Sequence, residues 1–240
     1  MEGKINKNIL AKVKKGFNLI IKGRTSIFLK ILNERLYSNK LSFGLKRDMR
    51  KAFTPPKAKI DIKVRRLEKQ DVNRLLNLDG LTEEETRMVE VQRDLINVNF
   101  KNCYVAVTAD DTPCYMQWIL SPSENLDIHR YFGMIFPKLQ EKEFLLEGAY
   151  MYPAFRGLKV MPHAMYRIAE KASKMGADSV LTFVTINNIP SLKGCKSCGF
   201  YPYILRKEKW VLFRHYVSFE AIPEKILSDY NTATTSVMSI

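Results

Sequence analysis

A strand-like run is joined to a helix-like run by residues 147–162, which read EGAYMYPAFRGLKVMP. Residues 144–152 are rich in apolar and aromatic side chains, and Pro153 ends this predicted strand because proline cannot donate a backbone hydrogen bond. Apolar residues then recur at helical spacing from Met161 to Met175, and Pro162 suits the first helical position. The sequence therefore predicts a strand, a short loop and a long amphipathic helix.

The loop between them is suited to an anion. The N-terminus of a helix presents unpaired N–H groups and the positive end of the helix dipole, which together favour a pyrophosphate. Gly157 lets phosphate oxygens approach the backbone, and Arg156 can add a charge-assisted contact. The strand near Met151 can pair its backbone with the amides of an extended ligand. The alternative is an ordinary strand–turn–helix connection with a surface arginine.

A second segment follows about 31 residues after Gly157, with Asn188-Ile-Pro-Ser191 and then Cys198-Gly199-Phe200. The two segments, in this order and spacing, resemble the acetyl-CoA-binding signature of the GCN5-related N-acetyltransferase (GNAT) superfamily. In that signature a strand ends in hydrophobic-x-Pro, an Arg/Gln-x-x-Gly-x-Gly/Ala loop opens a helix, and an Asn-x-x-Ala/Ser helix ends in Gly-Phe. The resemblance covers roughly residues 60–219. It departs at Lys159 and Met161, which replace two small residues and adopt positive φ less easily than glycine.

The resemblance implies an α/β (α+β) fold with a mixed, mostly antiparallel sheet flanked by helices. It implies direct transfer of an acetyl or other short acyl group from acyl-CoA to an unidentified primary amine, in a ternary complex and without a metal. The residues expected to bind the acyl-CoA are Met151, Tyr152, Arg156, Gly157, Leu158, Lys159, Val160, Met161, Asn188 and Ser191. The alternative function is a non-catalytic acyl-CoA-binding module with a basic arm, because a fold does not dictate a function.

Glu147 is the expected general base. A carboxylate inside an apolar strand has a raised pKa when it is partly buried, which suits proton transfer near neutral pH. Strand alternation places Glu147 on the same face as Ala149 and Met151. The alternative is a glutamate paired with a nearby lysine or arginine.

The expected general acid is Cys195, because its position matches the family's tyrosine, seven residues after Asn188. A thiol can donate a proton, although a small residue in a helix is the alternative interpretation. Tyr201 and Tyr203, just past this helix, are further candidate donors. His163, at the start of the long helix, is interpreted as a capping or surface group.

The four cysteines do not form a disulfide pattern, and we expect a cytoplasmic protein. The Cys-x-x-Cys at 195–198 lacks a second pair or spaced histidines, so it is a poor zinc signature. A redox pair usually opens a helix, whereas this pair closes one. By the resemblance, Gln117, Trp118 and the connection 121–142 lie where the acceptor pocket is built.

The positive charge is concentrated in residues 1–57. This segment holds 15 basic and 3 acidic residues, whereas the whole chain has a net charge of +14. Such a segment suits an anionic partner. Residues 5–22 combine an apolar helical stripe with lysines, a pattern typical of a helix lying in a membrane surface, so a peripheral membrane location is one hypothesis. The alternative is that the stripe packs on the domain. Nucleic-acid binding is disfavoured, because no basic motif interleaved with aromatic residues is present.

The predicted organisation is a basic extension at 1–57, an acyltransferase domain at 58–222 and a polar C-terminal tail at 223–240, with the first boundary at Thr54-Pro55-Pro56. Predicted helices are 5–22, 26–37, 71–78, 82–96, 161–175 and 191–198. Predicted strands are 41–45, 60–65, 103–108, 113–120, 144–152, 179–186, 200–205 and 210–219.

Overall fold

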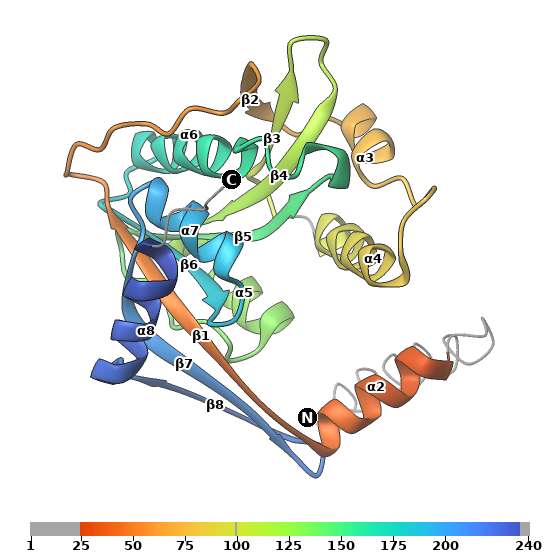
Figure 1. The fold of residues 1–240 in the computed structure, drawn as a ribbon, viewed down its shortest axis with the longest axis vertical. Coiled ribbons are helices and arrows are strands. Elements are labelled where there is room, and N and C mark those ends of the chain that lie inside the picture. Colours follow the sequence, from red (N-terminus) through yellow and green to blue (C-terminus); the bar gives the residue numbers. More distant parts are fainter. Residues whose placement is uncertain (1–24, 99, 236–240) are drawn as a thin grey trace. The chain divides into compact units, whose positions relative to one another are not determined.

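A computed structural model describes residues 25–98 and 100–235 (Figure 1). The α-helices are α2 (Thr25–Leu36), α3 (Lys69–Leu75), α4 (Glu83–Val98), α5 (Asn125–Phe132), α6 (Val160–Lys174), α7 (Ile189–Ser197) and α8 (Glu224–Thr235). The strands are β1 (Tyr37–Asp48), β2 (Ile62–Arg66), β3 (Cys103–Thr108), β4 (Pro113–Leu120), β5 (Glu143–Met151), β6 (Ser179–Thr185), β7 (Tyr201–Val211) and β8 (Arg214–Glu220). The predicted helix 5–22 lies outside the described residues.

The contacts divide the described chain into two units. Residues 25–41 and 207–218 form the small unit, and residues 42–206 and 219–235 form the large unit. The strands form one sheet in the order β2-β3-β4-β5-β6-β1-β7-β8. Four neighbouring pairs are antiparallel (β2–β3, β3–β4, β4–β5 and β1–β6), and β5–β6 is parallel. The predicted mixed, mostly antiparallel sheet flanked by helices is confirmed.

Helices cover both faces of the sheet in the large unit. All eight residues of β4 are buried, so this strand needs a partner layer on each face. Met116, Trp118 and Leu120 pack in one core with apolar residues of α3, α4 and α5. Tyr115 and Gln117 alternate with them and face the side where α6 and α7 lie. Figure 1 shows α6 and α7 next to each other, apart from α3 and α4.

β1 is longer than the predicted strand 41–45. Its residues 42–48 pair antiparallel with the whole of β6, from Ser42 opposite Thr185 to Asp48 opposite Ser179. The expected boundary at residue 57 therefore falls after a strand that belongs to the sheet of the large unit.

β5 and β6 pair over only three residue pairs, which end at Leu145 opposite Leu181. Beyond this point the two parallel strands separate, while β6 remains paired to β1. Backbone groups on the facing edges of β5 and β6 therefore have no partner strand there. This gap positions the candidate site.

A β-bulge corrects the predicted face of Glu147. In the β4–β5 pair, Met116 lies opposite Tyr150 and Trp118 lies opposite Glu147, so one residue of β4 faces two of β5. Directly opposed residues share a face, and Glu147 is therefore on the Trp118 face. Met151, opposite Tyr115, is on the other face. The prediction that Glu147 and Met151 share a face was wrong because the bulge shifts the alternation by one residue.

Two further segments are helical where the sequence predicted irregular structure. α5 forms within the connection 121–142, and its Ile128 is buried in the core. α8 forms within the predicted polar C-terminal tail, residues 223–240. It is held there because Tyr230 is buried with its ring 5.1 Å from that of Phe43, and because Lys196 donates to Thr234 Oγ1 at 3.0 Å.

Candidate functional site

A cleft of about 280 Å³ lies where β5 and β6 separate. Five elements and the turn before α7 line it, and it holds polar groups on an otherwise apolar wall. The lining residues are Tyr115, Gln117, Leu146, Glu147, Gly148, Ala149, Met161, Met165, Thr182, Phe183, Val184, Thr185, Asn188, Ser191 and Cys195. The structure thus brings together Glu147, Met161, Asn188, Ser191 and Cys195 from the residues predicted by sequence.

Glu147 is half-buried in this cleft. Burial raises the pKa of its carboxyl group above the ordinary value, and the backbone of Gly148 and the charge of Arg206 oppose that rise. Within the described residues, Arg206 is the basic side chain whose charge acts on this carboxylate. A carboxylate with a raised pKa can accept a proton near neutral pH.

The bulge next to Glu147 depends on glycine. Gly148 has a φ of +65°, and a Cβ there would lie 2.7 Å from the Trp118 ring and 2.9 Å from Leu95. A side chain would therefore be strained by both the backbone conformation and the lack of space. The extra residue of a bulge leaves backbone groups without a ladder partner, and these lie in the wall of the cleft.

The loop before α6 combines an open backbone with a strained residue. Gly157 has a φ of +80°, and nothing lies within 4 Å of a Cβ built there. Lys159 is the N-cap of α6 with a φ of +56°, the left-handed region that lysine disfavours. The helix begins at Val160, so Pro162 is its third residue, not its first as predicted, and one of the early helix N–H groups is absent. The remaining N–H groups and the Lys159 ammonium are suited to an anion.

Arg156 is not a free cation in this loop. Its Nη1 lies 2.7 Å from Glu85 Oε1 on α4. Glu85 also accepts hydrogen bonds from the N–H and hydroxyl of Thr82, and these contacts and Arg156 lower its pKa. Arg156 could turn toward a phosphate only by giving up part of this pair. Leu158, the next residue but one, accepts a hydrogen bond from the Lys59 N–H at 2.8 Å.

At the end of β5, the backbone edge that faces β4 is hydrogen-bonded. The Tyr152 N–H donates to Cys114 O at 3.0 Å, toward β4. Backbone groups alternate direction along a strand, so those of Met151 point away from β4, to the side where β6 has separated. Met151, and not Tyr152, is the residue whose backbone could pair with an extended ligand.

α7 contributes a cap and a thiol to the cleft. The Asn188 side chain accepts the Ser191 N–H at 3.2 Å and caps the helix. Cys195 is buried, its Sγ is 3.8 Å from Met165 Sδ, and burial raises its pKa to about 12. Cys195 is therefore protonated at neutral pH. Within the described residues, no three His, Cys, Asp or Glu side chains are grouped so that they could hold a metal.

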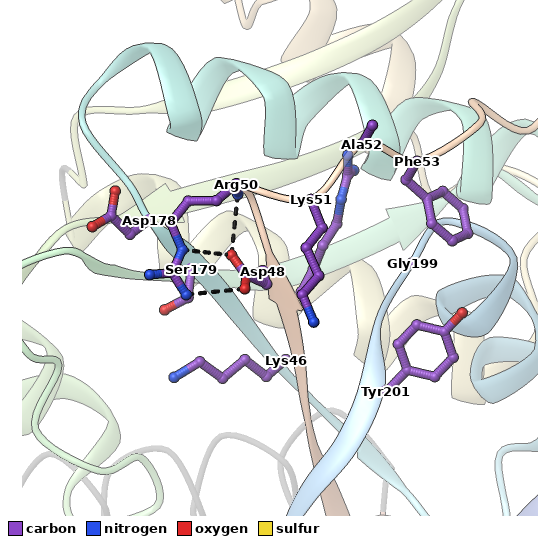
Figure 2. Close-up of a pocket in the computed structure, with 11 residues that line it drawn as sticks. Lys46, Asp48, Arg50, Lys51, Ala52, Phe53, Asp178, Ser179, Gly199 and Tyr201 are labelled. Carbon is purple, nitrogen blue, oxygen red and sulfur yellow. Dashed lines mark hydrogen bonds and ion pairs between the residues drawn. The ribbon is translucent and has the colours of Figure 1, made fainter.

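Tyr201 and Tyr203, the predicted alternative acids, do not line the cleft. Tyr201 is half exposed and lines a second cavity of about 440 Å³, together with Lys46 and Arg50. Figure 2 shows Tyr201 and Phe53 on one side of this cavity, and Arg50 hydrogen-bonded to Asp48 on the other. Neither tyrosine is brought near Glu147 by the cleft.

The sequence analysis missed Tyr115 and the β6 residues 182–185. Tyr115 is buried, its hydroxyl donates to Gln117 Oε1 at 2.9 Å, and burial raises its pKa well above the ordinary value. Gln117 was expected near the acceptor and does line the cleft, whereas Trp118 is buried in the core beside it. The alternation of Tyr115 and Gln117 in a buried strand was the only sequence signal for this pair.

A solved structure with a similar backbone is a region of a fungal multi-domain GH3 β-N-acetylglucosaminidase, described as a GCN5-related glucosamine N-acetyltransferase region. The TM-score is 0.55 at 9% sequence identity, over 78% of this chain and 22% of that one. This chain has the GNAT fold.

Two other solved proteins with the GNAT name are similar at lower scores. One is a GNAT-family acetyltransferase from Colwellia psychrerythraea, with 13% identity, a TM-score of 0.47, and coverage of 78% of this chain and 57% of that one. The other, from Brucella melitensis, was solved with acetyl-CoA and has 13% identity, a TM-score of 0.32, and coverage of 51% and 75%. No sequence-family model and no curated protein sequence matches the chain.

The chain spans less than two thirds of the first two of these GNAT structures, 22% of the fungal chain and 57% of the Colwellia chain. Among the residues that the structure describes, no helix is both long and apolar enough to cross a bilayer.

Proposed function

We propose that this chain transfers an acetyl or other short acyl group from acyl-CoA to a primary amine. The observation that carries the proposal is the separation of β5 from β6, which opens a cleft lined by Glu147, by the bulge and by the start of α6. The GNAT fold supports it at the level of the fold. Function is argued from this site and not from the fold alone.

The residues present fit an acyl-CoA. The open backbone at Gly157, the N–H groups of Val160 and Met161, and the charge of Lys159 would hold the diphosphate. The free backbone edge at Met151 would pair with the amides of the pantetheine arm. Asn188 and Ser191 line the far wall of the cleft, where the arm would pass between β5 and α7.

The bound acyl-CoA would supply an acyl carbon activated by its thioester. Glu147 would accept a proton from the amine, directly or through a water, as the C–N bond forms. When the C–S bond breaks, the departing thiolate needs a proton, and a cleft group that is protonated at neutral pH would donate it. Cys195 and Tyr115 both meet this condition, because burial raises the pKa of each.

The choice between these two acids has a structural basis. The Tyr115 proton is shared with Gln117 Oε1, so this phenol has a polar partner that can reorient after donation. In the described part of the chain, the Cys195 thiol has the Met165 thioether as its partner, and its thiolate would be left beside an apolar group. We therefore propose Tyr115 as the acid. Tyr115→Phe should lower turnover more than Cys195→Ser does.

The experiment is a measurement of thiol release from acetyl-CoA in the presence of a panel of amines. The panel contains polyamines, amino sugars, and peptides with a free lysine or N-terminus. Release that requires one class of amine, with the acylated amine seen by mass spectrometry, supports the proposal. Propionyl-CoA and longer acyl-CoAs, measured with the same amine, give the chain-length limit of the cleft.

The alternative is a module that binds acyl-CoA without transferring the acyl group. It predicts a rise of melting temperature with CoA and no amine-dependent thiol release from any member of the panel. If saturating CoA leaves the melting temperature unchanged, both the transferase and the binding module are rejected.

A further inference from the structure

The turn between β7 and β8 has an unusual backbone for its residues. It consists of Leu212 and Phe213, with φ values of +46° and +65°. Two-residue hairpin turns with positive φ at both positions favour Asn-Gly or Gly-Gly, because these residues tolerate the left-handed region. Leucine and phenylalanine tolerate it poorly, so the backbone conformation of the turn does not explain why these two residues occupy it.

Both side chains are exposed to solvent. Leu212 is 71% exposed and Phe213 is 52% exposed. Their N–H groups donate to the carbonyls of Leu36 (2.9 Å) and Arg35 (2.8 Å), which gives partners to two carbonyls at the C-terminal end of α2. Leu36 and Tyr37 are exposed as well. These four residues, Leu36, Tyr37, Leu212 and Phe213, lie together and are called the apolar tip below.

The apolar tip belongs to a unit with more basic than acidic residues. The described residues of the small unit contain Lys30, Arg35, Lys40, Lys207, Lys209 and Arg214 against Glu34 and Glu208. Glu34 lies 3.1 Å from Lys40, and Glu208 lies 3.5 Å from His215. The unit that carries the exposed apolar residues therefore has an excess of positive charge, a combination that is complementary to an anionic lipid surface.

Stacked side chains hold the tip in shape. The Arg35 guanidinium lies 5.7 Å from the ring centre of Trp210, and Trp210 stacks on His215 at 4.4 Å with an interplanar angle of 12°. Trp210 is two residues before the turn, so it lies at the base of the tip. Tryptophan and tyrosine near apolar anchors are typical of the interface between lipid headgroups and acyl chains.

We propose that the apolar tip inserts into the headgroup region of an anionic bilayer and that the lysines and arginines of the same unit bind the lipid headgroups. Leu212 and Phe213 would be the anchors, and the strained turn keeps both at the end of the hairpin. The proposal goes beyond acyl transfer and does not depend on it. It also differs from binding through residues 5–22, because it rests only on described residues.

The test is co-sedimentation of the full chain with vesicles of phosphatidylcholine alone and of equal parts phosphatidylcholine and phosphatidylserine. The wild type should bind only the anionic vesicles, binding should fall with salt, and the Trp210 fluorescence should shift to the blue. The double variant Leu212→Asn/Phe213→Gly should bind at least about tenfold more weakly, because two apolar side chains no longer leave water.

The melting temperature of this double variant shows whether it folds. It introduces the residues that the turn prefers, so its melting temperature should equal or exceed that of the wild type. Leu126→Asn is the matched control, because Leu126 is 79% exposed on α5 of the large unit and lies outside the tip. The control should keep the full lipid affinity.

Three results would overturn the proposal. The first is a wild type that binds neither kind of vesicle or binds both equally. The second is a folded double variant that binds as tightly as the wild type, which would assign the affinity to other residues such as 5–22. The third is a wild type that dimerises without lipid while the double variant is monomeric, which would make the tip an interface between copies.

Discussion

Three turns in the described part of the chain place residues other than glycine in the left-handed region, and one of them is the β3–β4 turn with Asp111. The other two turns differ in what surrounds them. Lys159 adopts it at the start of α6, and Leu212 and Phe213 adopt it between β7 and β8. Such a conformation costs about 1–2 kcal/mol for each residue. A lysine at the N-terminus of a helix also destabilises that helix by about 0.3–1 kcal/mol, because its charge lies at the positive end of the helix dipole.

The difference lies in the chemistry that each turn presents. Lys159 places a positive charge beside the open backbone of Gly157, close to a cleft. The β7–β8 turn presents two apolar side chains, and neither lines the cleft or the second cavity. Both turns thus hold residues that local stability disfavours, one suited to a phosphate and the other to an apolar phase. Five predictions test whether the two roles are separate.

The largest effect is expected from the chemistry of the large unit. Glu147→Gln should lower turnover about 10²-fold, because the base is lost while CoA binding is kept. In the wild type, kcat/KM should rise with pH through the raised pKa of Glu147, since only the carboxylate accepts the proton. Glu143→Gln is the control, because Glu143 is on the same strand and pairs with Lys46 at 2.7 Å. A pH profile unchanged in Glu147→Gln would remove Glu147 from the mechanism.

The second effect concerns the diphosphate. Gly157→Asp should abolish the stabilisation by CoA, which is about 2.7 kcal/mol at a concentration 100 times Kd. Gly176→Asp is a matched control, because Gly176 also has positive φ and open space but lies at the other end of α6. Thermal unfolding with and without CoA measures both. Equal loss in the two variants would show only a general destabilisation.

The third effect concerns the apolar tip. Leu212→Asn/Phe213→Gly should raise the free energy of unfolding by about 2 kcal/mol, because strain at two positions is relieved. Urea unfolding measures this gain, and amine-dependent turnover should stay the same. A double variant that is less stable would mean that the two side chains are packed and are not free for a partner.

The fourth effect is a trade-off at the other turn. Lys159→Gly should raise the free energy of unfolding by about 1 kcal/mol and weaken CoA binding, since strain and charge are removed together. Lys159→Asn separates the two, because asparagine tolerates the conformation but carries no charge. Unchanged CoA affinity in both variants would break the proposed role of this lysine.

The smallest effect concerns the contact between Ala58 and His163 of α6. The Ala58 N–H donates to His163 Nδ1 at 3.4 Å, and burial with the nearby Arg167 lowers the pKa of His163. The neutral form is thus favoured in the folded state. Its contribution to stability should be complete above the ordinary pKa of 6.5 and be lost as pH falls below it. The difference in unfolding free energy between pH 7.5 and pH 5 should shrink in His163→Asn.

Much of the site could be predicted because its signals are local. A proline, a glycine and an apolar helical face predict the loop and α6, and Asn188 predicts the cap of α7. Tyr115 could not be predicted in the same way, because its place in the cleft depends on where two distant strands separate. No local pattern reports that separation.

The sequence contained a signal that could have corrected the predicted face of Glu147. An isolated glycine inside a strand pattern indicates a bulge, and Gly148 directly follows Glu147. The full length of β1 had no such signal. Its last residues, Lys46, Arg47 and Asp48, are charged, and Lys46 and Arg47 pair with Glu143 and Glu170, which are about 100 residues or more away in sequence.

The position of β1 also constrains how the chain folds. β1 leaves the ribosome long before β6, because the residues that pair between them are roughly 140 positions apart in sequence. β6 has seven pairs with β1 and three with β5, so its main partner is the more distant strand. Closing such a long loop comes late and slowly, and until then β1 is an unpaired edge that can associate with other chains. Amide protons of β1 and β6 should therefore be the last to gain protection during refolding, and yield should fall with protein concentration.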